Sequence, residues 1–337
     1  MGLRALAALL VLAGPAAAEP LRVATYDAGL SRKGPGLLLR DLGREDAQID
    51  AAVRVIADAR PDILLLTGFD WDHDGLALTA LRKRLTAAGA EYPHSFSARP
   101  NAGMVSGLDL DRDGRLGGPG DNQGFGFFTG QKGMAILSRH PIGPVADHSA
   151  VLWRDLPGHI APPDTPPEQR LSSVAHWDAV VSVAGKPLHL LAMAASPPVF
   201  DGPEDRNGRR NHDELAFWQT HLPDAPFVLL GKLNVDPVDG DGRPEALAAM
   251  LAHVTDTLPR SDGGAAQPGG VNDRHKGDPA LDTANWPADK MGNLRVDYVL
   301  PAKALPVLGS GVVWPGGDGV AQTASVHRLV WVDIDWR

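Results

Sequence analysis

The chain has 337 residues, no cysteine and a formal net charge of −9. Without cysteine it can contain no disulfide, no thiolate nucleophile and no cysteine-ligated zinc or iron–sulfur site. The acidic balance argues against extended binding of nucleic acid, although it is compatible with a local cationic pocket. A chain of this length can bury a core large enough to fold without cross-links.

The first 18 residues have the composition of a secretory signal. A single charge at Arg4 precedes the apolar run Ala5–Ala13, and three alanines ending at Ala18 provide an Ala-x-Ala cleavage pattern. The alternative, a buried N-terminal helix, is disfavoured by Gly14-Pro15 directly after the apolar run. We therefore expect cleavage near Ala18, a periplasmic or secreted protein and a single domain over residues 19–337. No other stretch approaches a transmembrane length, so no membrane partner is expected.

Apolar residues recur with the periods of strands and helices along the rest of the chain. Several expected strands follow one another without a helix between them, which favours two packed sheets with helices outside. The segments 100–131 and 261–293 are expected to be long loops, and such loops are often functional. In chain order we expect a strand at 21–26, a helix at 49–57, a strand at 63–66, a helix at 78–85, strands at 134–137, 174–183 and 188–193, a helix at 214–221, a strand from Phe227, a helix at 246–251, and strands at 295–300 and 329–334.

Five segments resemble, in the correct order, motifs of the endonuclease/exonuclease/phosphatase superfamily. They are Pro61–Leu66, Gly133–Arg139, Phe227–Asn234, Arg295–Leu300 and Ala324–Arg328. The polar run that begins at Asp201 further resembles exported bacterial members. The resemblance implies an α/β fold of the DNase I-like type, a four-layer α/β/β/α sandwich. It also implies the family activity, metal-dependent hydrolysis of phosphoric esters.

The resemblance assigns three retained positions to the site. Asn234 and His327 stand where the family has its asparagine and histidine, and Asp297 is the expected orienting partner of His327. At the end of the first strand the family has an asparagine near the metal, and Asp27 occupies that position. Asp27 is thus the one candidate metal ligand that the family pattern leaves.

Four other site positions depart from the family pattern. The metal-binding glutamate is replaced by Gly68, the phosphate-binding histidine by Ala194, and two aspartates by Lys232 and Val326. When Asp27 in place of asparagine is also counted, the net charge of the site is three units more positive than in the family pattern. A unit charge on a cation 4 Å from Lys232 would meet about 4 kcal/mol of repulsion at intermediate dielectric. No metal cofactor is therefore expected in the family site.

One hypothesis is a non-catalytic protein with a metal-free pocket for a small anion or phosphate. Lys232, Asn234 and His327 would bind this ligand, with Lys132 as a further candidate. An equally open interpretation is that Lys232 is a structural replacement for the lost metal and pairs with Asp27 or Asp297, because ion-pair networks also perturb buried charges. The sequence indicates no particular protein partner.

The alternative hypothesis is an active phosphodiesterase or nuclease that uses Mg²⁺ or Mn²⁺ in a rearranged site. Its ligands would come from Asp27, Asp70, Asp72 or His73. Alternating acids such as those at 70–74 are, however, more often a solvated loop.

A separate stretch has the alternating acids and glycine that open an EF-hand loop. Asp109, Asp111 and Asp113 precede Gly114, but the twelfth position is Gly120 instead of glutamate. The stretch therefore predicts either a structural Ca²⁺ loop of another kind or a solvated turn.

Overall fold

The computed structural model describes residues 20–316 and 319–337. The predicted signal sequence, residues 1–18, lies outside the described residues, and its export function stays a prediction. Among the described residues, none of the helices combines the length and apolar composition that a bilayer-spanning segment needs.

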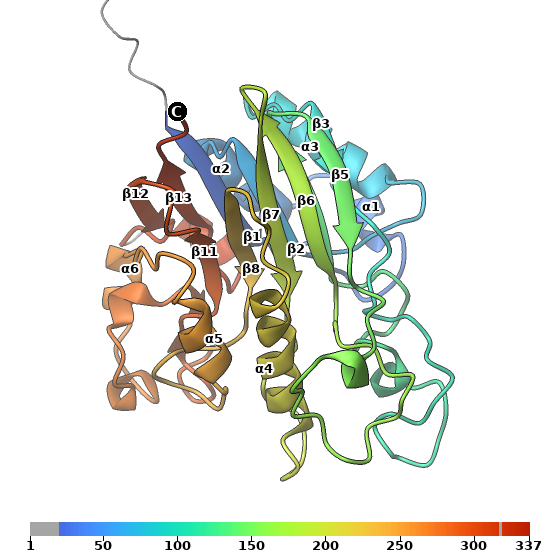
Figure 1. The fold of residues 1–337 in the computed structure, drawn as a ribbon. Helices are drawn as coiled ribbons and strands as arrows, with labels where there is room; N and C mark the ends of the chain where they lie inside the picture. The colour runs from blue at the N-terminus through green and yellow to red at the C-terminus, as the bar shows by residue number, and fades with distance from the viewer. Residues whose placement is uncertain (1–19, 317–318) are drawn as a thin grey trace, which may run out of the picture.

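Two β-sheets form the centre of the molecule (Figure 1). The first has six strands in the order β12 (Val307–Val312), β13 (Val330–Ile334), β1 (Leu21–Asp27), β2 (Ile63–Phe69), β4 (Gly133–Ser138) and β3 (His94–Phe96). The second has five strands in the order β11 (Asp297–Pro301), β8 (Phe227–Lys232), β7 (Lys186–Ala194), β6 (His176–Val183) and β5 (Ile142–Asp147). Strands β1 and β2 are parallel, as are β7 and β8.

Alternation of side chains along the first sheet divides the core in two. Val23 and Leu65 point toward the second sheet, whereas Ala24 and Leu66 pack under helices. Those helices are α1 (Leu37–Leu42), α2 (Ala47–Ala59), α3 (Leu76–Ala87) and α7 (Gly319–Ala324), while α4 (Arg206–Gln219) and α5 (Glu245–Met250) cover the second sheet. The predicted four-layer α/β/β/α sandwich is confirmed.

The long loops are largely irregular. The 261–293 segment contains α6 (Asp262–Ala265), two short 3₁₀ turns and β9 (Ala284–Asn285), which pairs with β10 (Asn293–Leu294). The segment 100–131 contains one 3₁₀ turn, Pro119–Asp121.

The expected strands and helices all form, but the sequence patterns missed the edges. The edge strands β3, β5 and β12 were not predicted, because β3 has only three residues and β5 and β12 each have exposed positions and a glycine. Helix α4 begins at Arg206, well before the predicted position 214, because its first two turns bury Arg210 and Asn211 in place of apolar residues. Periodicity of apolar residues cannot detect a helix face of this kind.

Strand register gathers the expected site residues at one edge of the sandwich. Asp27 and Thr67 are paired across β1 and β2, directly before Gly68. Lys232 is the register partner of both Ala194 on β7 and Asp297 on β11. The loops that follow β1, β2, β7 and β8 lie in the lower part of Figure 1, and Asp297 reaches the same edge at the start of β11, which runs antiparallel to β8.

Candidate ligand-binding site

A cleft of about 1560 Å³ opens at this edge of the two sheets. Seven of the residues predicted for this site line it, namely Asp27, Gly68, Lys132, Lys232, Asn234, Val326 and His327. Asp297 is fully buried and does not line the cleft. Ala194 is also buried, and its neighbour Ala195 lines the cleft in its place.

An ion pair joins the two sheets at the bottom of the cleft. The Nζ atom of Lys232 on β8 lies 2.5 Å from Oδ2 of Asp27 on β1. Burial alone would raise the pKa of Asp27, but the charges of Lys232 and His327 and the hydrogen bonds from Lys232 and the Gly29 amide hold it well below its usual range. Burial lowers the pKa of Lys232, but Asp27 and Asp297 raise it further, so that the net shift is upward. Both partners of the pair are therefore charged at neutral pH.

Gly68 provides the space for this carboxylate. Its φ of +62° is a conformation that residues with a Cβ adopt only under strain. A Cβ built on Gly68 would lie 2.1 Å from Oδ1 of Asp27. No side chain at position 68 is compatible with the present position of Asp27.

The retained histidine is held by a chain of buried groups. Nδ1 of His327 lies 2.8 Å from Oδ2 of Asp297, and the hydroxyl of Thr283 donates to the same oxygen at 3.1 Å. The Thr283 hydroxyl also accepts the N–H groups of Val296 and Asp297, each at 2.9 Å. Thr283 was not predicted from the sequence, because it lies in a loop that no family motif covers. His327 lines the cleft, and Trp286 contacts its ring edge-on at 5.3 Å between centroids.

The remaining predicted positions contribute little charge. The side-chain amide of Asn234 donates to the carbonyl oxygen of Ala195 at 2.7 Å, which ties the loops after β7 and β8 together. Val326 is 46% exposed at the rim of the cleft. Its backbone carbonyl accepts the Asn285 N–H, so this residue holds the loop through its backbone.

Three of the four candidate ligands of a rearranged metal site, all except Asp27, do not line the cleft. The Asp70 carboxylate accepts the N–H groups of Arg32 at 2.7 Å and Lys132 at 3.0 Å, and burial raises its pKa. Asp72 caps α3, where it accepts two backbone N–H groups at 2.8 Å. His73 contacts Trp71 edge-on. All three stand outside the residues that line the cleft.

The residues present do not fit a divalent cation in the family position. Magnesium needs oxygen ligands from carboxylates with room for water or phosphate. Here one oxygen of Asp27 contacts an ammonium and the other accepts the Gly29 N–H at 3.2 Å. A cation at Asp27 would have to displace Lys232 or share its carboxylate with it.

The cleft as a whole carries no excess of positive charge. Its lining contains eight lysine or arginine residues and eight aspartate or glutamate residues. A phosphate-backbone groove needs a continuous cationic surface, and this balance does not provide one.

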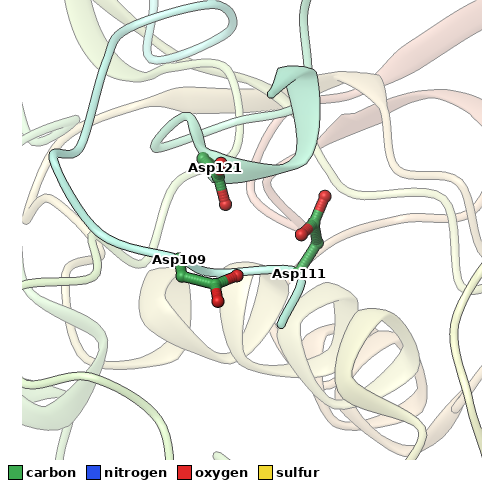
Figure 2. Close-up of side chains that lie close together, drawn as sticks. All are labelled: Asp109, Asp111 and Asp121. Carbon is green, nitrogen blue, oxygen red and sulfur yellow. The ribbon is translucent and has the colours of Figure 1, made fainter. Parts of the chain in front are cut away.

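An acidic cluster lies in the predicted calcium loop, with different membership from that expected. Figure 2 shows Asp109, Asp111 and Asp121, whose ligand atoms lie within 4.8 Å of one another. Asp121 joins the cluster through the 3₁₀ turn that brings the chain back. The expected Asp113 does not take part, because its carboxylate accepts the Arg115 N–H at 2.8 Å in its own turn. The described residues contain no other group of three such side chains with this spacing.

A buried pair on α4 supports one wall of the cleft. The Arg210 guanidinium donates to backbone carbonyls of Gln123 at 2.6 Å and Leu171 at 2.8 Å, and to two others in the same segment. Glu214 accepts the Ser173 and Ser196 N–H groups at 2.6 Å each. The many local charges around Arg210 did not indicate that its partners would be distant carbonyl groups.

The chain belongs to the endonuclease/exonuclease/phosphatase family, whose model matches residues 29–325. Its fold is similar to that of an endonuclease/exonuclease/phosphatase from Beutenbergia cavernae DSM 12333, with a TM-score of 0.57, 21% identity, and coverage of 94% of this chain and 72% of the other. A family protein from Leptotrichia buccalis C-1013-b gives a TM-score of 0.55 at 15% identity, covering 94% of this chain and all of the other. A comparison with curated proteins found no match. These identities establish a common fold and no shared substrate.

Proposed function

We propose that this chain is an exported, non-catalytic member of its family whose cleft binds a small anionic ligand without a divalent cation. The observation that carries the proposal is the Lys232–Asp27 ion pair above Gly68. An ammonium group and the carboxylate it neutralises occupy the region that a metal ion needs for ligands. Three positions that depart from the family pattern, Asp27, Gly68 and Lys232, thus form one local arrangement.

The absence of fitting metal ligands has a direct chemical consequence. Hydrolysis of a phosphoric ester requires stabilisation of charge on the phosphoryl oxygens and activation of water. His327 and Asp297 retain the geometry for holding a proton, but Gly68 and Ala194 offer no side chain that could stabilise those oxygens. Binding without turnover is the expected result.

Several donors support anion binding at the bottom of the cleft. Lys232 uses one of its three N–H groups for Asp27, and His327, whose Nδ1 contacts Asp297, lines the cleft. Because Asp27 neutralises Lys232, we expect a simple anion to bind only in about the millimolar range.

Calorimetric titration with inorganic phosphate in the presence of EDTA tests this function. We expect weak binding to the wild-type protein that Lys232→Ala abolishes, with Lys303→Ala, an exposed lysine away from the cleft, as a matched control. If neither the wild-type protein nor the Lys232 variant binds phosphate, the anion pocket is wrong.

The second candidate is an active phosphodiesterase or nuclease that depends on Mg²⁺ or Mn²⁺. The intact His327–Asp297 contact favours it. Turnover of a phosphodiester or phosphomonoester that requires either metal, and that Asp72→Ala or Asp27→Ala removes, would establish this candidate.

We further propose a structural calcium ion at Asp109 and Asp111, with Asp121 as third ligand in place of Asp113, supported by the closeness of these three carboxylates. A rise in melting temperature on addition of Ca²⁺ that Asp121→Asn removes would support it, and an unchanged melting temperature would reject it. We propose no membrane or extended nucleic-acid partner. Fractionation of cells that express the full chain tests whether the protein is exported.

A further inference from the structure

Two exposed phenylalanines from segments far apart in the sequence line the same cleft. Phe125 is 66% exposed and Phe200 is 85% exposed. Large aromatic side chains on a rim of this kind expose apolar surface to water, which is a common feature of binding sites. Burying either ring against a ligand would therefore be favourable.

Local structure constrains the backbone of Phe200 and the ring of Phe125. Phe200 has a φ of +71° in the segment between β7 and α4, a conformation that costs on the order of 1 kcal/mol in a bulky residue. Phe125 packs edge-on against Phe127, with ring centroids 5.6 Å apart at 84°. Phe127 is equally exposed but does not line the cleft. Backbone strain at an exposed aromatic residue indicates that its position serves something other than stability.

A lysine without an ionic partner lies in the same cleft. Lys132 is exposed, has a φ of +52°, and is fixed by its backbone N–H, which donates to Asp70 at 3.0 Å. Within the described part of the chain, no acidic group pairs with its ammonium. Lys132 therefore offers a positive charge that Asp27 does not neutralise, unlike Lys232.

We propose that the ligand of this cleft is a small organic anion that carries an aromatic ring. Its anionic group contacts Lys132 and its ring packs against Phe125 and Phe200, all three of which line the cleft. The inference rests on the proposed metal-free function and specifies its ligand class. The charge balance favours a ligand with a ring, because a cleft with equal numbers of acidic and basic side chains attracts a simple anion only weakly. Ring burial then supplies the additional affinity.

Two probes separate the contribution of the anionic group from that of the ring. Phenylphosphonate and methylphosphonate carry the same anionic group and differ in the ring. In calorimetric titrations with EDTA present, we expect phenylphosphonate to bind about tenfold more tightly, since two aromatic contacts of about 0.7 kcal/mol each give that factor.

Three variants and two controls assign the contacts. Phe125→Ala and Phe200→Ala should each reduce the preference for phenylphosphonate about threefold, whereas Lys132→Gln should weaken both probes by the same factor. Leu116→Ala and Lys303→Gln remove an exposed apolar and an exposed basic side chain outside the cleft, and should change neither affinity.

Each other outcome overturns a defined part of the account. Equal affinities for the two probes, no binding of either, or a preference that both phenylalanine variants retain would contradict the aromatic site. Self-association of the wild-type protein that Phe125→Ala reverses, without any ring preference, would show the rim to be a protein interface instead. A ring preference that appears only with Mg²⁺ present would leave the aromatic site standing and would contradict the metal-free function.

Discussion

The carboxylate of Asp27 occupies the space in which a side chain at Gly68 would begin, since a Cβ there would lie 2.1 Å from Oδ1. The same carboxylate is held by Lys232 from the opposite sheet. The three positions therefore depend on one another. Restoring the family's glutamate at position 68 alone would create a clash and would not restore a metal site.

Gly68→Ala should destabilise the protein more than backbone strain alone predicts. A left-handed conformation costs a residue with a Cβ about 1 kcal/mol, and displacement of Asp27 adds to this. Gly75→Ala is the matched control, because Gly75 has a φ of +64° and no atom lies within 4 Å of the point that its Cβ would occupy. In urea denaturation, Gly68→Ala should lower the free energy of unfolding by at least about 1 kcal/mol more than Gly75→Ala does. Equal losses would mean that Asp27 moves without cost.

The ion pair predicts strong coupling in a double-mutant cycle. Lys232→Met leaves Asp27 charged and buried, which should cost about 3 kcal/mol, and Asp27→Asn should recover part of that loss. The lowered pKa of Asp27 means that the stabilisation is present above the unfolded pKa of about 3.9 and is lost as the pH falls through the folded value. The coupling measured by urea denaturation should thus be the same at pH 5 and pH 8. Additive effects would contradict the pair.

Mild acid should destabilise the protein through a different residue. Burial beside the core lowers the pKa of His176 to about 4, and its Nε2 contacts the Glu214 carbonyl oxygen at 2.8 Å. The unfolded chain binds this proton near pH 6.5, so stability should fall between pH 6.5 and 4 by up to about 3 kcal/mol. His176→Phe should flatten that part of the stability-against-pH curve, even if it lowers stability overall. A slope that this variant leaves unchanged would reject the assignment.

Arg210→Lys should loosen one wall of the cleft. The guanidinium donates to four backbone carbonyl groups, and a lysine ammonium cannot reproduce this fork. We expect the free energy of unfolding to fall by about 2–4 kcal/mol. The substitution should accelerate amide exchange more in residues 170–173 than in α3, which is remote from this contact. Arg54→Lys, at an exposed ion pair on α2, provides the control for the substitution itself. Uniformly faster exchange would argue for a global effect only.

The fold could be predicted because its strands and helices carry strong apolar periods and the motifs occur in order. Much of the site could be predicted as well, because Asp27 and Lys232 are the last residues of β1 and β8, and His327 lies shortly before β13, which runs antiparallel to β1. The sequence left open whether Lys232 would pair with Asp27 or Asp297. Both carboxylates lie close to Lys232, but its ammonium contacts Asp27, whose carboxylate occupies the space left free by Gly68.

Other features depend on contacts that no pattern records. Thr283 orients Asp297 from a distant loop, and Asp121 replaces Asp113 beside Asp109 because the chain folds back there. Neither contact has a fixed spacing in sequence. Long-range contacts of polar side chains with loops are the part of a site that periodicity and motifs detect least well.

Hydrolysis of bis(4-nitrophenyl) phosphate in the presence of Mg²⁺, Mn²⁺ or Ca²⁺ shows whether the protein is a metal-dependent phosphoesterase or a non-catalytic member of its family. The matched control is the double variant His327→Ala, Asp297→Asn, prepared in parallel so that any contaminating phosphatase appears in both samples. The account predicts that wild-type and variant proteins release nitrophenol at the same background rate with every metal. Metal-dependent turnover by the wild-type protein that the double variant lacks would contradict it.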